Sequence, residues 1–315
     1  MDASILKFLP GVRKNIPLAP YTTFKIGGPA KYFFVAKTEQ DVCNAITAAK
    51  KYRVPMFVLA GGSNVLVSDK GFLGLVVLLS MKQYSMKGTV LTAEAGVDMR
   101  TLVKETGKRG LSGFEWAGGL PGSVGGVVRG NAGAFGGETK DSIVSVAALD
   151  KKGTIKKLSG KACAFSYRNS LFKEKNWIVL SATFQLKKGN KEKIQAIAKE
   201  HIRYRKERHP LEYPNAGSVF KNCPFSKFSK KLQNELSHIV KIDPFPVIPT
   251  AYLISEARLK GLRVGKAEVS RKHPNYIVNK GGAKAKDVLL LIEKVKKAVK
   301  KKFSVDLEVE VQYIA

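Results

Sequence analysis

The first 80 residues alternate between the spacing of a strand and that of a helix. An apolar run at 31–36 predicts a strand, and apolar positions at helical spacing predict a helix over 39–52, which Thr38 would cap. The apolar runs that follow predict further strands at 55–60, 65–68 and 73–79. We therefore expect a small βαββ-like unit over residues 1–80.

Two more regions follow along the chain. The second, 81–208, holds a glycine-rich segment at 113–137 among strands and helices predicted at 89–95, 98–108, 145–149, 154–158, 177–186 and 191–208. The third, 209–315, holds a strand, two helices and a final strand, predicted at 217–221, 250–258, 285–302 and 305–314. This order predicts an α+β fold with two N-terminal lobes, 1–80 and 81–208, and a C-terminal lobe, 209–315.

Length and composition agree with a globular protein of two or three domains. The chain has 315 residues, of which 44% are apolar and 25% charged. Its net charge of +30 admits three interpretations: binding to nucleic acid, attraction of small polyanions, or a lysine-rich proteome. The densest run, 294–302, falls on an amphipathic helix with Val295, Val299 and Phe303 inward, so we interpret its lysines as a solvated face.

The sequence contains no feature of a membrane or exported protein. The start, Met1–Leu6, lacks the basic and apolar parts of a signal peptide, and the most apolar stretch, 72–79, is far shorter than the ~20 residues that span a bilayer. The cysteines, Cys43, Cys163 and Cys223, have neither disulfide nor metal-ligand spacing. We expect a cytoplasmic protein without a metal site and without membrane insertion.

Two glycine-rich segments are candidates for anion binding. Gly61-Gly62-Ser63-Asn64 follows an apolar strand, where its N–H groups could bind a pyrophosphate, although the tetrapeptide taken alone slightly favours an ordinary tight turn. The longer segment covers 118–126 and 131–138, and Pro121 suits the first turn of a helix whose amides would point at phosphate. The spacing matches neither a Rossmann fingerprint nor a phosphate loop, so both of these nucleotide-binding folds are disfavoured.

These two segments resemble the paired pyrophosphate-binding loops of FAD domains of the vanillyl-alcohol-oxidase type. The longer one, together with 21–30, resembles the motifs of UDP-N-acetylenolpyruvoylglucosamine reductases. The resemblance implies a two-lobed FAD-binding domain of this type, a C-terminal α+β substrate-binding domain, and a last strand that packs back toward the active site. It implies non-covalent FAD, bound by Gly61, Gly62, Ser63, Asn64, Gly118, Gly119, Gly122, Ser123, Gly125, Gly126, Asn131 and Gly133.

Three further motifs extend the resemblance to the C-terminus, at 167–172, 215–222 and 307–311. The family's catalytic trio then falls on Arg168, Ser218 and Glu310, and its substrate-binding positions include Lys221 and Asn222. Taken singly, these residues could be a surface cation, a turn serine and an outward-facing strand glutamate. His273 is more often a structural hydrogen-bonding residue than a catalyst, so we keep it out of the acid–base roles.

The chemistry of that family explains why such residue types are needed. A hydride adds to an enolpyruvyl ether, so negative charge grows toward the carboxylate, where a guanidinium such as Arg168 stabilises it. The adjacent carbon then needs a proton, which Ser218 would supply while Glu310 orients the intermediate or returns the proton. The resemblance implies UDP-N-acetylglucosamine enolpyruvate and NADPH as substrates, for peptidoglycan precursor synthesis by a monomer.

Two alternatives remain open from the sequence. An FAD-linked oxidase of the same fold often carries flavin on His or Cys near the first loop, but neither residue type occurs between Tyr52 and Leu111. A basic nucleic-acid-binding protein would explain the charge but not the glycines at 118–137. We therefore expect no nucleic-acid partner.

Overall fold

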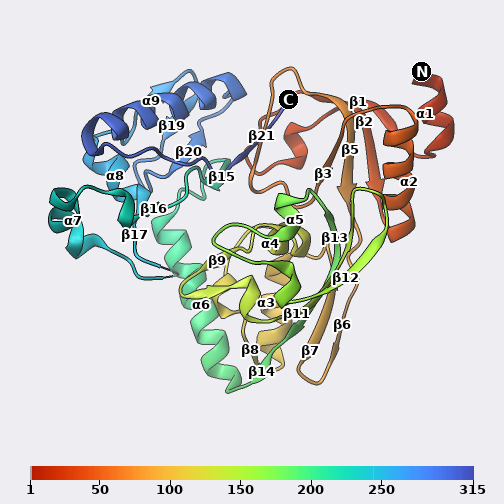
Figure 1. The fold of residues 1–315 in the computed structure, drawn as a ribbon, viewed down its shortest axis with the longest axis horizontal. Coiled ribbons are helices and arrows are strands. Elements are labelled where there is room, and N and C mark those ends of the chain that lie inside the picture. The colour runs from red at the N-terminus through yellow and green to blue at the C-terminus, as the bar shows by residue number, and fades with distance from the viewer. Residues whose placement is uncertain (1, 244) are drawn as a thin grey trace. The chain divides into compact units, whose positions relative to one another are not determined.

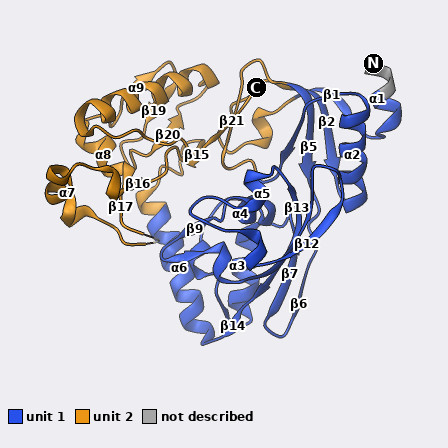
Figure 2. Ribbon diagram, viewed as in Figure 1, with its two compact units in different colours: residues 1–16, 30–61, 73–205 blue, residues 17–29, 62–72, 206–315 orange. Residues whose placement is uncertain are grey.

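The structure is a computed structural model that describes residues 2–243 and 245–315 (Figure 1). Met1, part of the N-terminal segment considered above, and Pro244, in the C-terminal region, lie outside the described residues. The chain divides into two compact units (Figure 2): unit 1 holds residues 1–16, 30–61 and 73–205, and unit 2 holds 17–29, 62–72 and 206–315. A division of the first 208 residues into two lobes at residue 80 stays a prediction.

Unit 1 is built on two sheets. The first has the order β1-β2-β5-β3, in which β3 and β5 run parallel, and the second is antiparallel in the order β12-β11-β13-β7-β6. Their strands are β1 (Arg13–Pro17), β2 (Pro29–Ala36), β3 (Met56–Leu59), β5 (Phe72–Leu79), β6 (Tyr84–Lys87), β7 (Val90–Glu94), β11 (Ile143–Leu149), β12 (Ile155–Ser159) and β13 (Ile178–Gln185). Short pairs are formed by β8 (Leu111–Ser112) with β14 (Lys187–Lys188) and by β9 (Gly133–Ala134) with β10 (Gly137–Glu138).

The α-helices described in these segments are α1 (Asp2–Phe8), α2 (Glu39–Lys51), α3 (Met99–Lys108), α4 (Val124–Arg129), α5 (Leu171–Glu174) and α6 (Lys191–Arg208). The last three residues of α6 are counted with unit 2. The predicted cap of α2 is confirmed, since the Thr38 hydroxyl accepts the Asp41 N–H at 3.1 Å in a capping box. Asp98 caps α3 by accepting the Arg100 N–H at 2.8 Å.

Unit 2 has an antiparallel sheet in the order β15-β20-β19-β18, against which α9 packs. Its helices are α7 (Lys230–Leu236), α8 (Thr250–Glu256) and α9 (Ala285–Phe303). Its strands are β4 (Val65–Val67), β15 (Asn215–Ser218), β16 (Cys223–Pro224), β17 (Val247–Ile248), β18 (Arg263–Val264), β19 (Ala267–Val269), β20 (Tyr276–Asn279) and β21 (Gln312–Ile314). The expected α+β class is confirmed.

Segments far apart in sequence complete the core of unit 2. Phe24, Ile26 and Leu66 are buried in one hydrophobic cluster with residues of 216–311. The Asp69 carboxylate accepts the N–H groups of Ala285 and Lys286, at 2.7 and 3.1 Å, at the first turn of α9. Burial of apolar surface and satisfaction of orphan helix donors therefore fix these N-terminal segments in unit 2.

Some sequence predictions of elements were wrong in extent. The final strand was expected over 305–314, but β21 covers only Gln312–Ile314, because the preceding residues pair with 219–221 before the chain turns to β4. The strand expected at 217–221 ends at Ser218, as β15. The helix expected to begin at Pro121 begins at Val124, so Pro121 precedes it.

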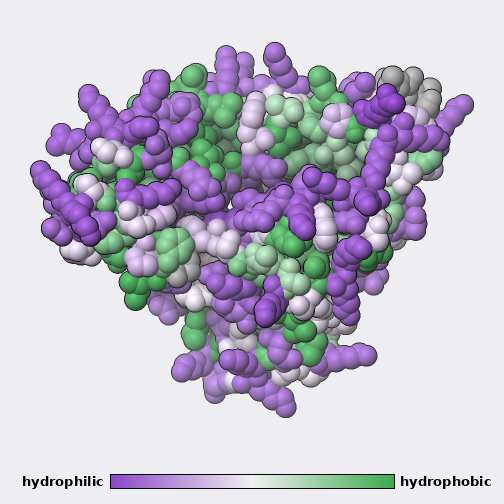
Figure 3. All heavy atoms as spheres, in the orientation of Figure 1, coloured by the Kyte–Doolittle hydropathy of each residue, from purple (hydrophilic) through white to green (hydrophobic). Residues whose placement is uncertain are grey.

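The predicted amphipathic helix at the C-terminus is confirmed. In α9, Val295, Val299 and Phe303 are buried, whereas most of the lysines at 294–302 are exposed. Hydrophilic side chains cover much of the face drawn in Figure 3. None of the described helices is both long and apolar enough to cross a bilayer.

We expect Asp69→Ala to lower the free energy of unfolding by about 1 kcal/mol, because two N–H groups at the start of α9 lose their acceptor. Urea denaturation at neutral pH measures the change. The matched control is Asp306→Ala, which removes an exposed ion pair with Lys300 (2.9 Å) and should cost less than about 0.5 kcal/mol. Equal losses in the two variants would contradict the capping role.

Candidate active site

The glycine-rich segment of unit 1 contains α4, with Ser123 at its N-cap position. The Ser123 side chain does not cap the helix; its hydroxyl is buried and has no hydrogen-bond partner among the described residues. A Cβ atom on Gly61 would lie 3.0 Å from Gly122 Cα and 3.0 Å from Ser123 N, so the two expected loops meet backbone to backbone. A buried hydroxyl that still needs a partner, beside closely packed loop backbones, fits a site for the pyrophosphate of FAD.

Several glycines of this segment are required by the protein itself. A Cβ on Gly118 would lie 2.6 Å from Ala198 O, one on Gly125 2.9 Å from Ala95 Cβ, and one on Gly133 2.8 Å from Glu138 Cγ. Gly126 differs, because it is exposed and a Cβ there would meet nothing within 4 Å. Of these four glycines, Gly126 is therefore the one position that packing within the protein does not require to be glycine.

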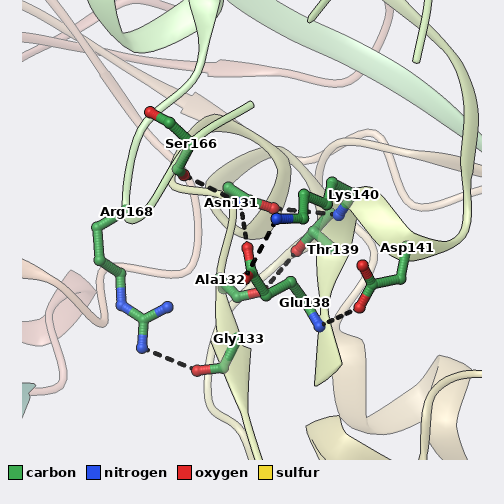
Figure 4. Close-up of polar contacts among 9 residues, drawn as sticks. All are labelled: Asn131, Ala132, Gly133, Glu138, Thr139, Lys140, Asp141, Ser166 and Arg168. Carbon is green, nitrogen blue, oxygen red and sulfur yellow. Dashed lines mark hydrogen bonds and ion pairs between the residues drawn. The ribbon is translucent and has the colours of Figure 1, made fainter. Parts of the chain in front are cut away.

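Arg168 lies in a tight turn whose flanking residues, Ser166 and Asn169, exchange two backbone hydrogen bonds of 3.2 and 3.1 Å. Its φ of +55° is a left-handed conformation that costs free energy for a non-glycine residue. The guanidinium donates to Gly133 O at 2.8 Å (Figure 4), and Lys173 Nζ donates to Arg168 O at 2.9 Å. The structure therefore brings the predicted catalytic cation to the glycine-rich segment.

Residues of α6 hold the same segment, and no sequence signal pointed to them. The His201 ring stacks on Phe135 at 3.9 Å between centroids, and the guanidinium of Arg205 lies 5.1 Å from the Phe135 centroid. Arg205 Nε also donates to Gly118 O at 2.9 Å. Between 66 and 87 residues separate these partners along the chain, so only the folded structure reveals the contacts.

In unit 2, the segment 62–64 and the end of the chain are joined by hydrogen bonds. Gly62 has a φ of +60°, and a Cβ there would lie 2.1 Å from Tyr21 O, which requires glycine. Asn64 Nδ2 donates to Glu310 O at 3.2 Å, and Gln312 N donates to Asn64 O at 3.0 Å. Ser63 lies between Gly62 and Asn64 in the same segment. The expected cofactor residue Asn64 is thus bound to the expected catalytic residue Glu310.

The segment that carries Glu310 also pairs with the residue that follows Ser218. Glu310 N donates to Val219 O at 2.8 Å, so the two predicted catalytic residues of unit 2 stand on hydrogen-bonded neighbouring segments. The motif at 21–30 supports that strand, since Thr23 Oγ1 donates to Asn215 O at 2.7 Å and Asn279 Nδ2 donates to Phe24 O at 3.2 Å. Backbone pairing therefore places a serine and a glutamate 92 positions apart beside one another.

Lys221 and Asn222, the expected substrate-binding residues, both have contacts within unit 2. The Lys221 ammonium forms an ion pair with Glu308, and Lys221 N donates to Glu308 O at 2.9 Å. Asn222 Oδ1 accepts the Thr250 N–H at 3.2 Å, at the start of α8. The ion pair holds the ammonium beside the segment that carries Glu310.

His273 belongs to an aromatic cluster beside β15. Its ring lies 5.2 Å from His209 and 4.8 Å from Tyr276, whose hydroxyl contacts His209 Nδ1 at 3.0 Å. Burial, together with the Lys241 charge, lowers the pKa of His273 to about 4 from its ordinary value of 6.5, so the ring is neutral near pH 7. Tyr276 is the direct partner of Ser218 in the β15–β20 pair.

Among residues 2–243 and 245–315, no group of three or more His, Cys, Asp or Glu side chains is arranged to hold a metal ion.

Comparison with known proteins gives concordant matches. A family model described as UDP-N-acetylenolpyruvoylglucosamine reductase, C-terminal domain, matches residues 209–314, and an FAD binding domain model matches residues 30–159. The UDP-N-acetylenolpyruvoylglucosamine reductases of Clostridium novyi (strain NT) and Caldanaerobacter subterraneus subsp. tengcongensis are 41% and 40% identical to the chain, over 96% and 95% of it and 92% of each relative.

The crystal structure of UDP-N-acetylenolpyruvylglucosamine reductase (MurB) from Thermus caldophilus is similar in fold as well. It shares 33% sequence identity with the chain at a TM-score of 0.77, and the match covers 96% of this chain and 100% of that one. These matches confirm the fold class expected from the sequence, an FAD-binding domain followed by a C-terminal α+β domain, and FAD as the cofactor.

Gly126→Ala is expected to separate the stability of the protein from its affinity for FAD. Alanine fits without a clash and has the higher helix propensity, so the apoprotein should gain about 0.5–1 kcal/mol, while FAD packed on this position should bind roughly tenfold more weakly. Urea denaturation and flavin titration give the two quantities. The control is Gly107→Ala in α3, where a Cβ would make an ordinary 3.5 Å contact; unchanged FAD affinity in both variants would remove Gly126 from the site.

The low pKa of His273 predicts that stability falls as the pH drops. Between pH 6.5 and 4 the unfolded histidine binds a proton that the folded one excludes, so the free energy of unfolding decreases by about 1–2 kcal/mol from pH 7 to pH 5. His273→Gln should reduce this decrease, as measured by urea denaturation at both pH values. Replacement of the exposed His238 by Gln should leave the decrease in the free energy of unfolding unchanged. The same pH dependence in wild type and His273→Gln would show that other groups cause the decrease.

Proposed function

Because the chain belongs to the UDP-N-acetylenolpyruvoylglucosamine reductase family, we propose that it reduces UDP-N-acetylglucosamine enolpyruvate to UDP-N-acetylmuramate with FAD and NADPH. The observation that carries this proposal is family similarity along nearly the whole chain, through both the FAD-binding part and the C-terminal domain. The reaction provides a precursor of peptidoglycan. We place the enzyme in the cytoplasm as a monomer, with no nucleic-acid partner.

The FAD site is assigned to both glycine-rich segments. In unit 1, Gly61, Gly122 and Ser123 would hold the pyrophosphate, with the buried Ser123 hydroxyl as a hydrogen-bonding group. In unit 2, Gly62, Ser63 and Asn64 complete the assignment. FAD held by these residues would supply the hydride transfer from NADPH to the enolpyruvyl group.

Arg168 has the role of pairing with the substrate carboxylate. Hydride addition at the terminal carbon moves negative charge toward that carboxylate, and a guanidinium held in place stabilises the charge as it forms. The bond from Arg168 to Gly133 O supports this role, because it restricts the guanidinium before substrate arrives.

Ser218 has the role of proton donor to the neighbouring carbon. A serine hydroxyl is a weak acid, but the enolic intermediate is a strong base, so proton transfer is feasible when the geometry is fixed. Glu310 orients that intermediate or returns a proton to the serine. The hydrogen bond from Glu310 N to Val219 O, next to Ser218, supports a shared site for the two residues.

Lys221 and Asn222 are assigned to the nucleotide phosphates of the substrate. An ammonium is suited to phosphate as a compact charge, and an amide offers N–H donors. Lys221 already pairs with the largely exposed Glu308, so an incoming phosphate competes with a carboxylate that is readily solvated. The remaining cofactor positions, Gly118, Gly119, Gly125, Gly126, Asn131 and Gly133, shape the segment around the flavin.

Anaerobic spectroscopy tests the proposed function. The purified protein should show oxidised flavin that NADPH bleaches and that UDP-N-acetylglucosamine enolpyruvate restores without oxygen. Restoration by oxygen alone would instead favour another FAD-linked oxidoreductase, and a protein that binds no FAD on reconstitution would refute the proposal.

Ser218→Ala separates the two halves of the reaction. NADPH should bleach the flavin of this variant at the wild-type rate, whereas turnover of the enolpyruvyl substrate should fall by about 10²–10⁴-fold, the usual contribution of a general acid. Stopped-flow absorbance measures both steps. Wild-type turnover in Ser218→Ala would exclude the serine as the proton donor.

A further inference from the structure

Asn131 is the centre of a buried network in unit 1 (Figure 4). Its side chain is 0% exposed, and both N–H groups of its amide are used: Nδ2 donates to Glu138 Oε2 at 2.5 Å and to Ser166 O at 3.0 Å. Its Oδ1 accepts the Lys140 N–H at 3.1 Å. The amide therefore binds three separate points of the chain: Glu138 at the end of the glycine-rich segment, Lys140 two residues further on, and Ser166 at the turn that carries Arg168.

The contacts close into a ring around Arg168. Ser166 and Asn169 clamp the turn, and Arg168 Nη2 reaches back to Gly133 O at 2.8 Å. Gly133 is the direct partner of Glu138 in the β9–β10 hairpin, and Glu138 in turn accepts from Asn131. Each link fixes the next, so a displacement of the Ser166 carbonyl displaces the base of the guanidinium.

Backbone strain and charge indicate that the ring has a purpose beyond loop folding. Arg168 is left-handed, with a φ of +55°, a conformation that a long side chain keeps only where contacts enforce it; the φ of +41° at Asn131 is one that asparagine tolerates. Glu138 is 9% exposed, and its bond to the amide is charge-assisted. Its other oxygen pairs with Lys140, 3.4 Å away, whose side chain is 42% exposed, so the buried amide contact is the stronger link.

We infer that Asn131 and Glu138 are positioning residues for Arg168, acting through the Ser166 carbonyl and the β9–β10 hairpin. This inference rests on the proposed function, in which Arg168 pairs with the substrate carboxylate. A planar guanidinium matches a carboxylate only in a narrow range of orientations, and a misplacement of about 1 Å can reduce a rate by about 10²-fold. The network selects that orientation before the substrate binds.

The inference predicts that the two half-reactions respond differently. Arg168 serves the enolpyruvyl substrate and not the reduction of flavin by NADPH. Glu138→Ala should therefore retain bound FAD and a normal rate of bleaching by NADPH, while anaerobic reoxidation by UDP-N-acetylglucosamine enolpyruvate slows by about 10–100-fold. Glu138→Gln, whose Oε1 still accepts from Asn131, should restore most of that rate.

A matched control lies on the same turn. Asn169 Nδ2 donates to Glu174 Oε1 at 2.6 Å, an exposed pair of the same chemistry. Glu174→Ala should leave both half-reactions within about twofold of wild type, because an exposed pair of this kind contributes little. A slowing equal to that of Glu138→Ala would overturn the specific role of the buried network.

A second variant covers the case in which Glu138→Ala loses FAD or fails to fold. Glu138→Asp keeps the carboxylate charge but shortens the side chain by one methylene, which withdraws the acceptor from Asn131 Nδ2. FAD binding and bleaching by NADPH should be normal and reoxidation by substrate slow.

Reoxidation within about twofold of wild type in Glu138→Asp would overturn the inference, as would equal slowing of both half-reactions in a variant that keeps its FAD. Failure of the proposed function is distinct, since wild type itself would then not be reoxidised by the enolpyruvyl substrate.

Discussion

Backbone pairing by the last residues of the chain is the interaction on which unit 2 depends. The segment 308–310 bonds to 219–221, Gln312 N bonds to Asn64 O, and β21 runs parallel to β4. These bonds pair backbone N–H and C=O groups of segments that lie far apart along the chain. The consequence is functional, because Asn64, Ser218 and Glu310 come together only through this pairing.

In unit 1, side-chain contacts rather than backbone pairing hold the glycine-rich segment in place. Its glycine-rich segment has too few side chains to form a core of its own, and neighbouring groups hold it from outside. Phe135 stacks on His201, Arg205 binds Gly118 O, and Asn131 joins the segment to the turn of Arg168. Preorganisation of this kind allows a backbone rich in glycine to present fixed hydrogen-bonding groups without a large entropic loss on binding.

Packing within the protein therefore accounts for some glycines of the segment but not for all of them. Gly118, Gly125 and Gly133 are required by contacts within the protein, whereas Gly126 is not. The sequence presents all four as one pattern. Only the folded structure separates the glycines that packing requires from the one that it does not.

Local sequence determined much of this protein. Hydrophobic periodicity and capping residues predicted α2, α3, α6 and α9 and most strands of unit 1, because those elements depend on side chains close together in the chain. The glycine segments and the motifs around Arg168, Ser218 and Glu310 identified the family and its cofactor. The sequence did not reveal that 17–29 and 62–72 belong to unit 2 or that the final strand divides between two partners.

Tertiary structure alone decided the partners of Asn131, Glu138, His201 and His273, since burial and long-range hydrogen bonds have no periodicity that a sequence can display.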